Sequence, residues 1–372
     1  MKRIIVSLYA YANSGADGIR VAGYIKGFIK LGYDVVLVTT AKEKIELKDD
    51  HLSIVLVGRK QTGPKVICKL VNSWRLVKET KLQYKKGDAI FFYSTPILGF
   101  LFGRKRKLFY EETEVPMHGG NESFSRQLMT KFYLWTTKRA TGLIVISNAL
   151  KNYYIEQGVS ADKICVSNMT VDLSRFEGIE KQSVEHRYIA YCGSISNHKD
   201  GVDTLIKAFA RVSKNLLDIK LYLMGLFSIP EEEKQDKELA RSLNIADKVV
   251  FCGLVSSREL PQMLKNADCL VLARPENKQA KYGFPTKLGE YLLTENPVVV
   301  TSVGDIPLFL KNRESAYLAE PNNIDDIAAK IEEALTSPNA VSIGKMGAQV
   351  ARLNFNSDIE TKKVVDFIIS NE

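Results

Sequence analysis

The chain has 372 residues, of which 45% are hydrophobic and 26% are charged, and this ordinary globular composition excludes a disordered or fibrous protein. Its five cysteines form no CxxC pair, which argues against a zinc site or a disulfide framework. The net charge of +9 is unevenly spread: residues 1–186 carry 29 basic and 18 acidic residues, whereas residues 187–372 carry 23 and 25. This asymmetry predicts two domains with different partners, and charge alone leaves nucleic acid, an anionic membrane and a phosphorylated substrate open.

In the first half, short apolar runs alternate with segments of helical periodicity. We expect strands at 4–8, 35–38, 54–57, 89–93, 107–110, 143–146 and 164–166, and helices at 21–30, 64–83, 124–140 and 148–157. Near-continuous apolar strands separated by helices are typical of a parallel sheet covered on both faces. The longest apolar stretch, 89–103, is too short to span a bilayer, and the first apolar run ends too early for a signal peptide.

The second half repeats this scheme. We expect strands at 188–192, 219–224, 249–252, 269–272 and 298–300, and helices at 202–214, 232–243, 257–266, 286–294 and 324–336. The pattern predicts an α/β fold with two doubly wound, Rossmann-like domains that face each other across a cleft. We place the N-terminal domain at 1–173, a polar linker at 174–187, the C-terminal domain at 188–356 and a last helical segment at 357–372. Ligands of such sheets bind at the carboxyl ends of the strands.

The segment 188–209 carries a first candidate anion site. A buried strand ends at Gly193, a polar loop presents Lys199, and Gly201 opens an amphipathic helix. Backbone amides at that helix start, together with one ammonium group, suit a diphosphate. The alternative is a plain strand–loop–helix crossover with a solvated lysine.

The segment 281–293 carries a second candidate anion site. Gly283 and Pro285 predict an irregular loop, and we expect Thr286 to cap a helix whose first turns include Glu290. The amides suit phosphate, and the carboxylate could accept hydrogen bonds from two ribose hydroxyls. The alternative is a glutamate that only complements the helix dipole.

These two segments resemble the C-terminal half of the retaining glycosyltransferases of family 4, which have the GT-B architecture. The loop 193–199, Gly225, the strand ends 250–253 and 267–272, and a Glu-x7-Glu element ending at Glu290 recur there in this order. The resemblance implies that the C-terminal domain binds a nucleotide-diphosphate sugar and the N-terminal domain binds the acceptor. It also implies that the helix at 357–370 returns to the N-terminal domain.

Two positions depart from the family pattern. The first glutamate of Glu-x7-Glu falls on Tyr282, whose hydroxyl could hydrogen-bond the sugar instead. The arginine that often follows the loop glycine falls on Ser194, so a second diphosphate cation must come from Arg274, Lys281 or Lys287. The variant sequence at 283–291 resembles a subgroup that builds bacterial surface polysaccharides.

The resemblance implies a donor site and a reacting centre. The expected donor-binding residues are Gly15, Gly193, Ser194, Lys199, Arg274, Lys281, Phe284, Pro285, Thr286, Lys287 and Glu290. We expect His118, Glu112 and Tyr282 at the reacting centre, with Glu114 as a further acidic alternative. The loop around Gly15 could equally be an ordinary turn, and His118 could be an inert surface histidine. The four histidines lack metal-ligand spacing and no DxD-like pair follows a strand, so no metal and no cofactor is expected.

The resulting hypothesis is a retaining glycosyltransferase that moves a sugar from a UDP- or GDP-sugar to a hydroxyl of a glycan acceptor, which is expected to be lipid-linked. The alternatives are a nucleotide-sugar 2-epimerase of the same architecture, which would need more acid/base histidines and carboxylates, and an inactive binding member, which the loss of glutamate at 282 would fit. We expect no nucleic-acid partner.

A basic region in the first half favours a location at a membrane surface. Between 58 and 107, thirteen basic residues face only Glu79 and Asp88. The segment 64–78 has an amphipathic pattern with one apolar face, formed by Ile67, Leu70, Val71, Trp74 and Val77. That face either contacts an anionic membrane or packs against the domain's own sheet. We expect a cytoplasmic protein, peripheral at the inner face of the membrane.

Overall fold

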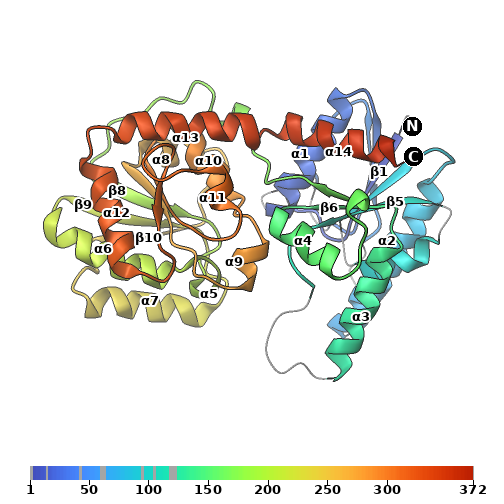
Figure 1. Ribbon diagram of the computed structural model, residues 1–372, viewed down its shortest axis with the longest axis horizontal. Coiled ribbons are helices and arrows are strands. Elements are labelled where there is room, and N and C mark those ends of the chain that lie inside the picture. Colours follow the sequence, from blue (N-terminus) through green and yellow to red (C-terminus); the bar gives the residue numbers. More distant parts are fainter. Residues whose placement is uncertain are drawn as a thin grey trace. The chain divides into compact units, whose positions relative to one another are not determined.

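The computed structural model describes residues 3–13, 16–41, 44–58, 64–93, 96–103, 106–116 and 124–371. The chain divides into two compact units, which we call unit 1 (Met1–Thr170 with Ser357–Glu372) and unit 2 (Val171–Asn356). The segment 174–187, which is predicted to be a linker, lies within unit 2. Each unit has a parallel sheet with helices packed against it (Figure 1).

The sheet of unit 1 has seven strands in the order β3-β2-β1-β4-β5-β6-β7, and every neighbouring pair is parallel. The strands are β1 Arg3–Leu8, β2 Asp34–Thr39, β3 Leu52–Leu56, β4 Ala89–Tyr93, β5 Lys107–Glu112, β6 Gly142–Val145 and β7 Ile164–Val166. In the central strand, Ile5 pairs with Val36 on one side and with Ile90 on the other. This order contains the doubly wound order 3-2-1-4-5-6, with the switch point between β1 and β4.

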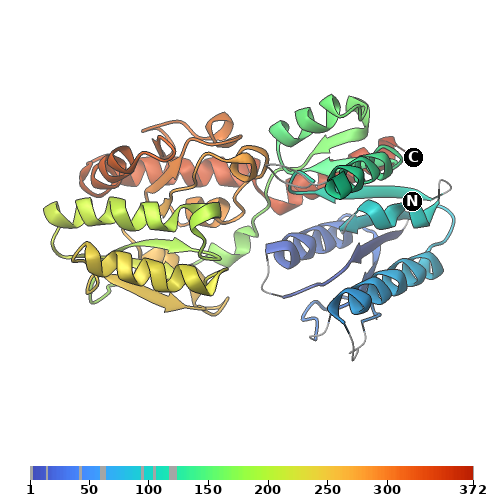
Figure 2. The same cartoon turned by 90° about the horizontal axis from the view of Figure 1, so that it is seen from below.

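Helices from both ends of the chain complete unit 1. They are α1 Ala16–Lys30, α2 Lys65–Gln83, α3 Phe124–Lys138, α4 Asn148–Glu156 and α14 Ser357–Ser370, with the 3-10 helices η1 Pro96–Phe102 and η2 Ala161–Lys163. Helix α14 lies along α1 (Figures 1 and 2), because Gly27 leaves room for it: a Cβ there would lie 2.7 Å from the Thr361 side chain. Val364, Val365 and Ile368 of α14 thereby join the core of this unit.

Unit 2 repeats the topology with six strands in the order β10-β9-β8-β11-β12-β13. The strands are β8 Arg187–Cys192, β9 Ile219–Met224, β10 Val249–Gly253, β11 Cys269–Leu272, β12 Val298–Thr301 and β13 Tyr317–Ala319. The helices are α5 Asn197–Asp200, α6 Val202–Asn215, α7 Pro230–Ser242, α8 Leu260–Asn266, α9 Lys278–Tyr282, α10 Lys287–Leu293, α11 Ile306–Phe309, α12 Ile324–Thr336 and α13 Ala340–Asn354, preceded by η3 Leu173–Phe176. Here the switch point lies between β8 and β11.

The predicted fold class is confirmed, since both units have parallel, doubly wound sheets built from the strands that the apolar runs predict. The strand β13 and the helices α5, α9, α11 and α13 were not predicted. Among the described residues, no helix is both long and apolar enough to cross a membrane.

Candidate functional site

The switch point of unit 2 is where a doubly wound sheet binds its ligand, beyond the carboxyl ends of β8 and β11. The chain leaves β8 through residues 193–196 into α5, and it leaves β11 through residues 273–277 into α9. Four side chains that the sequence places far apart meet here. They are Tyr191, Asp200, Arg274 and Lys287, which we call the switch-point cluster.

Asp200, the last residue of α5, is the centre of this cluster. Its carboxylate is 2% exposed and lies 2.6 Å from Lys287 Nζ and 3.7 Å from Arg274 Nε. The Tyr191 hydroxyl lies 2.7 Å from Asp200 Oδ2. Burial alone would raise the pKa of Asp200, but the two cations hold it below its usual range. Burial lowers the pKa of Lys287, and Asp200 opposes that shift.

Gly193 allows the Lys287 ammonium to lie against the loop backbone. Its φ of +147° is a left-handed conformation that favours glycine, and a Cβ there would overlap Lys287 Nζ. With Asp200 ionised and both cations charged, the cluster keeps one net positive charge. The loop after β8 is therefore lined by a partly neutralised pair of cations, which suits a ligand that carries negative charge.

Lys199 adds an exposed cation to the same short helix. Its backbone N–H donates to Ser196 Oγ at 3.3 Å, and its carbonyl accepts from Arg274 Nε at 3.5 Å. Ser194 is also exposed, and its Oγ lies 2.6 Å from Ser228 Oγ. The structure thus brings Gly193, Lys199, Arg274 and Lys287 together, whereas Asp200 and Tyr191 were missed because neither carries a motif of its own.

Glu290 lies one turn after Lys287 on α10 and forms an ion pair with Arg175 of η3. The two side chains are only 16% and 21% exposed. Arg175 was not predicted as a site residue, because it lies in the polar segment that the sequence pattern indicates to be a linker. The carboxylate expected to accept from ribose is therefore held in place by an arginine within the same unit.

The segment before α10 differs from expectation at Thr286. Thr286 stands at the N-cap position of α10 as predicted, but its side chain makes no capping hydrogen bond, and its backbone is already helical (φ −59°, ψ −33°) where an N-cap residue is usually extended. Pro285 is buried. Phe284 packs its ring 5.7 Å from Phe309 and 5.4 Å from Phe355, so the ring belongs to the interior of unit 2.

Lys281 and Tyr282 end helix α9. Lys281 is exposed, and its ammonium lies 5.3 Å from the centre of the Tyr282 ring. Tyr282 itself is half-buried. This pair marks the position where the family pattern has its first glutamate.

At the end of β5 in unit 1, two neighbouring carboxylates point to opposite faces of the sheet. Glu111 lies 2.5 Å from Arg20 Nε of α1, and Glu112 accepts from the Tyr133 hydroxyl of α3 at 2.5 Å. Among the described residues, Glu112 Oε1 has no hydrogen-bond partner. Burial raises the pKa of Glu112 to about 8. Glu114 is exposed.

Two of the expected site residues, Gly15 and His118, lie outside the described residues.

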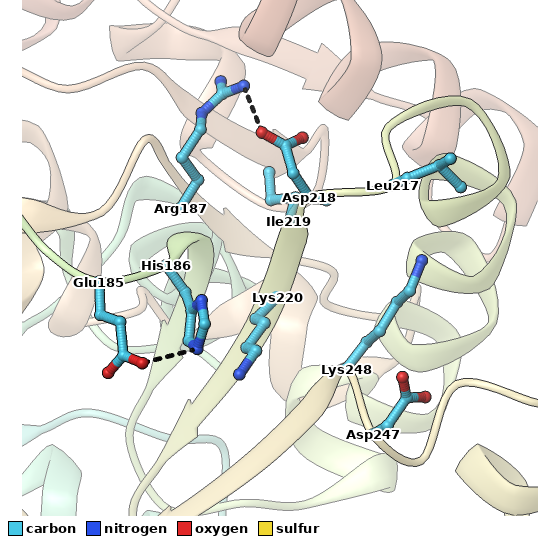
Figure 3. Close-up of a pocket in the computed structure, with 9 residues that line it drawn as sticks. All are labelled: Glu185, His186, Arg187, Leu217, Asp218, Ile219, Lys220, Asp247 and Lys248. Carbon is cyan, nitrogen blue, oxygen red and sulfur yellow. Dashed lines mark ion pairs between the residues drawn. The ribbon is translucent and has the colours of Figure 1, made fainter.

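A surface pocket of about 330 Å³ lies at the other edge of the unit 2 sheet (Figure 3). It is lined by residues at the amino ends of the strands, such as Arg187 of β8 and Ile219 of β9. Arg187 pairs with Asp218 at 3.8 Å, and His186 Nε2 lies 3.6 Å from Glu185 Oε1. This pocket is therefore separate from the switch-point cluster at the carboxyl edge.

Nowhere in the described ranges do three or more His, Cys, Asp or Glu side chains gather as a metal site would need.

Two family models match consecutive parts of the chain. The model described as Glycosyltransferase Family 4 matches residues 18–175, and the model described as Glycosyl transferases group 1 matches residues 175–349. Mannosylfructose-phosphate synthase of Agrobacterium fabrum is 27% identical over 177 residues, which span 46% of this chain but only 38% of the synthase. The capsular polysaccharide biosynthesis glycosyltransferase CapM of Staphylococcus aureus is 24% identical over 360 residues, 91% of this chain and 90% of CapM.

Among solved structures, Anabaena HepE in complex with UDP and glucose has the same fold, with a TM-score of 0.79 over 100% of both chains at 16% identity. The two family models together match nearly the whole chain. The chain belongs to the family 4 glycosyltransferases and has the GT-B fold.

Proposed function

We propose that this protein is a retaining glycosyltransferase that moves a sugar from a UDP- or GDP-sugar to a hydroxyl of a glycan acceptor. The observation that carries the proposal is the grouping of Lys199, Arg274, Lys287 and Glu290 at the carboxyl edge of the unit 2 sheet. Three cations suit a diphosphate, and one carboxylate suits the hydroxyls of a ribose. The solved relative HepE, which holds UDP and glucose, supports this assignment of the donor.

In this proposal the cations act on the leaving group. As the bond between the sugar and the diphosphate breaks, negative charge grows on the phosphate oxygens, and positive charge placed beforehand stabilises it. Asp200 keeps the Lys287 ammonium fixed in position, while the exposed Lys199 can turn toward the ligand. Ser194, Lys281 and Thr286 are the proposed additional polar contacts with the donor, and Gly15 is the proposed contact from unit 1.

The acceptor hydroxyl would attack the sugar on the face that the diphosphate leaves, so that the configuration is retained. His118, Glu112 and Tyr282 are the proposed side chains of the reacting centre. Of these, Tyr282 has a hydroxyl where the family pattern has a carboxylate. We propose that the acceptor is a lipid-linked glycan of cell-surface polysaccharide synthesis, reached from the cytoplasmic side, and the similarity to CapM, a capsular polysaccharide biosynthesis glycosyltransferase, supports this class.

The test begins with a thermal-shift screen of UDP, GDP and ADP and their sugars, because a ligand that binds the folded state raises the melting temperature. The best donor is then incubated with and without a lipid-linked glycan fraction, and the products are followed by NMR. Release of UDP or GDP only in the presence of acceptor, with an unchanged anomeric configuration in the product, supports the proposal. A changed sugar without acceptor would indicate an epimerase, and donor binding without either product would indicate an inactive member.

A further inference from the structure

Helix α2 of unit 1 turns its apolar face outward. Ile67, Leu70 and Trp74, which follow one another at helical spacing, are 56%, 63% and 56% exposed. The buried side of the same helix carries Asn72, Ser73 and Thr80 beside Leu76 and Val77. Of the two alternatives for this segment, packing of the whole apolar face against the sheet is therefore excluded. An ordinary surface helix has the opposite arrangement, with its polar residues in the solvent.

Thr80, one of the polar residues of the buried side, has partners inside unit 1. Thr80 Oγ1 lies 2.9 Å from Ser7 Oγ of β1, and its hydroxyl donates to the Leu76 carbonyl at 2.8 Å. The orientation of α2 is thus fixed by contacts with the sheet. Its exposed apolar residues remain on the outside as a consequence.

The exposed apolar surface continues onto η1 and α3. The 3-10 helix η1 packs against both α2 and α3. Its Phe100, which is 47% exposed, meets the Phe132 ring edge-on at 5.6 Å, and Phe132 stacks on Trp135. We call six of the exposed apolar residues of these three elements the docking surface: Ile67, Leu70, Trp74, Phe100, Leu128 and Trp135. An exposed apolar patch of this kind marks an interaction site.

The charge around the docking surface selects the partner. Helices α2 and α3 together carry eight basic residues and a single acidic one, Glu79. Lys78 Nζ lies 5.1 Å from the centre of the Trp74 ring, and the Arg139 guanidinium lies 4.4 Å from that of Trp135. Tryptophan beside lysine or arginine is the combination that suits a membrane interface, where rings enter the headgroup region and cations meet lipid phosphates.

We propose that the docking surface binds an anionic lipid bilayer. A bilayer of anionic lipids matches both of its properties, since it offers apolar depth for the six side chains and negative charge for the lysines and arginines around them. This inference goes beyond the proposed function, because it concerns a surface of unit 1 and not the donor site of unit 2. It would bring the enzyme to the surface where a lipid-linked acceptor is found.

The chain has two tryptophans, and both lie on the docking surface, so intrinsic fluorescence reports on it directly. We expect the emission to shift to shorter wavelength on addition of vesicles containing equal parts phosphatidylglycerol and phosphatidylcholine. Vesicles of phosphatidylcholine alone should give no shift, and about 0.5 M salt should reverse most of it, because screening shortens the reach of the charges. Trp74→Phe and Trp135→Phe should each keep a shift, reported by the tryptophan that remains.

Paired variants identify the residues responsible. Ile67→Glu with Leu70→Glu should lower the vesicle partition coefficient measured by cosedimentation by at least about tenfold, the equivalent of about 1.4 kcal/mol. The matched control is Val341→Glu with Leu353→Glu on α13, where two leucine- and valine-sized side chains are similarly exposed and binding should not change. Lys69→Glu with Lys78→Glu should weaken binding, whereas Lys214→Glu with Lys345→Glu in unit 2 should not.

Absence of a fluorescence shift and of cosedimentation at low salt would overturn the proposal. So would a concentration-dependent dimer in sedimentation that Ile67→Glu abolishes, since a second copy of the chain would then cover the surface. All variants are also titrated with UDP and GDP without vesicles. Loss of vesicle binding with normal nucleotide binding is a result about the docking surface alone, so failure of this inference is distinguishable from failure of the donor site.

Discussion

Both units contain a buried ion pair at the carboxyl edge of their sheets, but the two pairs differ in their exposure to solvent. In unit 1, Arg20 and Glu111 are 2% and 0% exposed, and the guanidinium also donates to the carbonyls of Ser167 and Asn168. In unit 2, the Lys287 side chain that pairs with Asp200 is 16% exposed and lies next to an open loop. The same topology thus supports two uses of charge.

The difference follows from what each charge can reach. Arg20 donates hydrogen bonds to Glu111, to the Tyr24 hydroxyl and to two carbonyls after β7. The ion pair therefore links α1 to the sheet, and its donors face the protein interior. Lys287 shares its partner Asp200 with Arg274 and also donates to the Tyr191 hydroxyl, and Gly193 places no Cβ against its ammonium. A fully buried ion pair can only stabilise the fold, whereas a partly exposed cation that shares its counter-charge with a second cation can also bind the anion of a ligand.

Arg20→Ala should have the largest effect on stability. It leaves the Glu111 carboxylate buried without its cation, and breaking such a pair costs about 3–5 kcal/mol. Urea unfolding measures the loss. Lys30→Ala is the matched control, because its ion pair with Asp358 is exposed and should contribute less than about 1 kcal/mol. Equal effects of the two variants would contradict the assignment of a closed pair to unit 1.

Glu112→Gln should change how stability depends on pH. With a folded-state pKa of about 8 against an ordinary value near 4.5, Glu112 binds a proton in the native state that the unfolded chain has lost over this range. Because the native state binds more protons than the unfolded state, the free energy of unfolding of the wild type should fall by roughly 2–4 kcal/mol from pH 5 to pH 8. The glutamine resembles the protonated acid and should remove this dependence. Urea unfolding at pH 5 and pH 8 measures this change. If the free energy of unfolding changes with pH equally in the wild type and in Glu112→Gln, Glu112 is not protonated in the native state.

Lys287→Ala should destabilise unit 2 less than Arg20→Ala destabilises unit 1. Asp200 keeps Arg274 and the Tyr191 hydroxyl, so the loss is that of two hydrogen bonds of Lys287, to Asp200 and to the Tyr191 hydroxyl, of which the charged one contributes about 1.5–3 kcal/mol. Nucleoside diphosphate binding should weaken by about tenfold at the same time. Calorimetric titration of this variant, with Lys345→Ala as the exposed control, separates the two effects. Unchanged nucleotide binding would make the Lys287 pair as purely structural as that of Arg20.

Arg175→Ala should weaken nucleotide binding by a smaller factor, about three- to tenfold, because Arg175 acts through the position of Glu290. Arg175→Lys should restore part of the affinity. In a Glu290→Ala background, Arg175→Ala should have no further effect, since two residues of one pair are not additive. Tighter nucleotide binding by Arg175→Ala would show instead that the ion pair competes with the ligand.

The sequence predicts the strands well, because burial on both faces leaves a continuous apolar run, as at Ala89–Tyr93. It does not predict β13, which has three residues, or α13, whose glycines Gly344 and Gly347 lower helix propensity. Periodicity also cannot tell whether the apolar face of α2 is covered, because that depends on which side the sheet contacts.

For the candidate site, motif spacing predicts which loops carry ligand-binding residues, but it does not predict the ion-pair partners of those residues. It directs attention to Lys287 and Glu290, but their counter-charges Asp200 and Arg175 are distant in sequence and carry no local signal. Arg175 in particular stands in a polar segment that resembles a linker. Only the folded chain brings these charges within contact distance, so the ion pairs could not be predicted from composition or spacing.

The most direct test of the donor site is the affinity of Glu290→Ala for whichever nucleoside diphosphate stabilises the wild type most. Loss of hydrogen bonds to a carboxylate should weaken binding about ten- to a hundredfold in calorimetry, while Glu314→Ala, an exposed carboxylate of the same unit, should bind like the wild type. If Glu290→Ala folds and binds the nucleotide as tightly as the wild type, the donor does not lie at the carboxyl edge of this sheet beside Glu290, and the account is wrong.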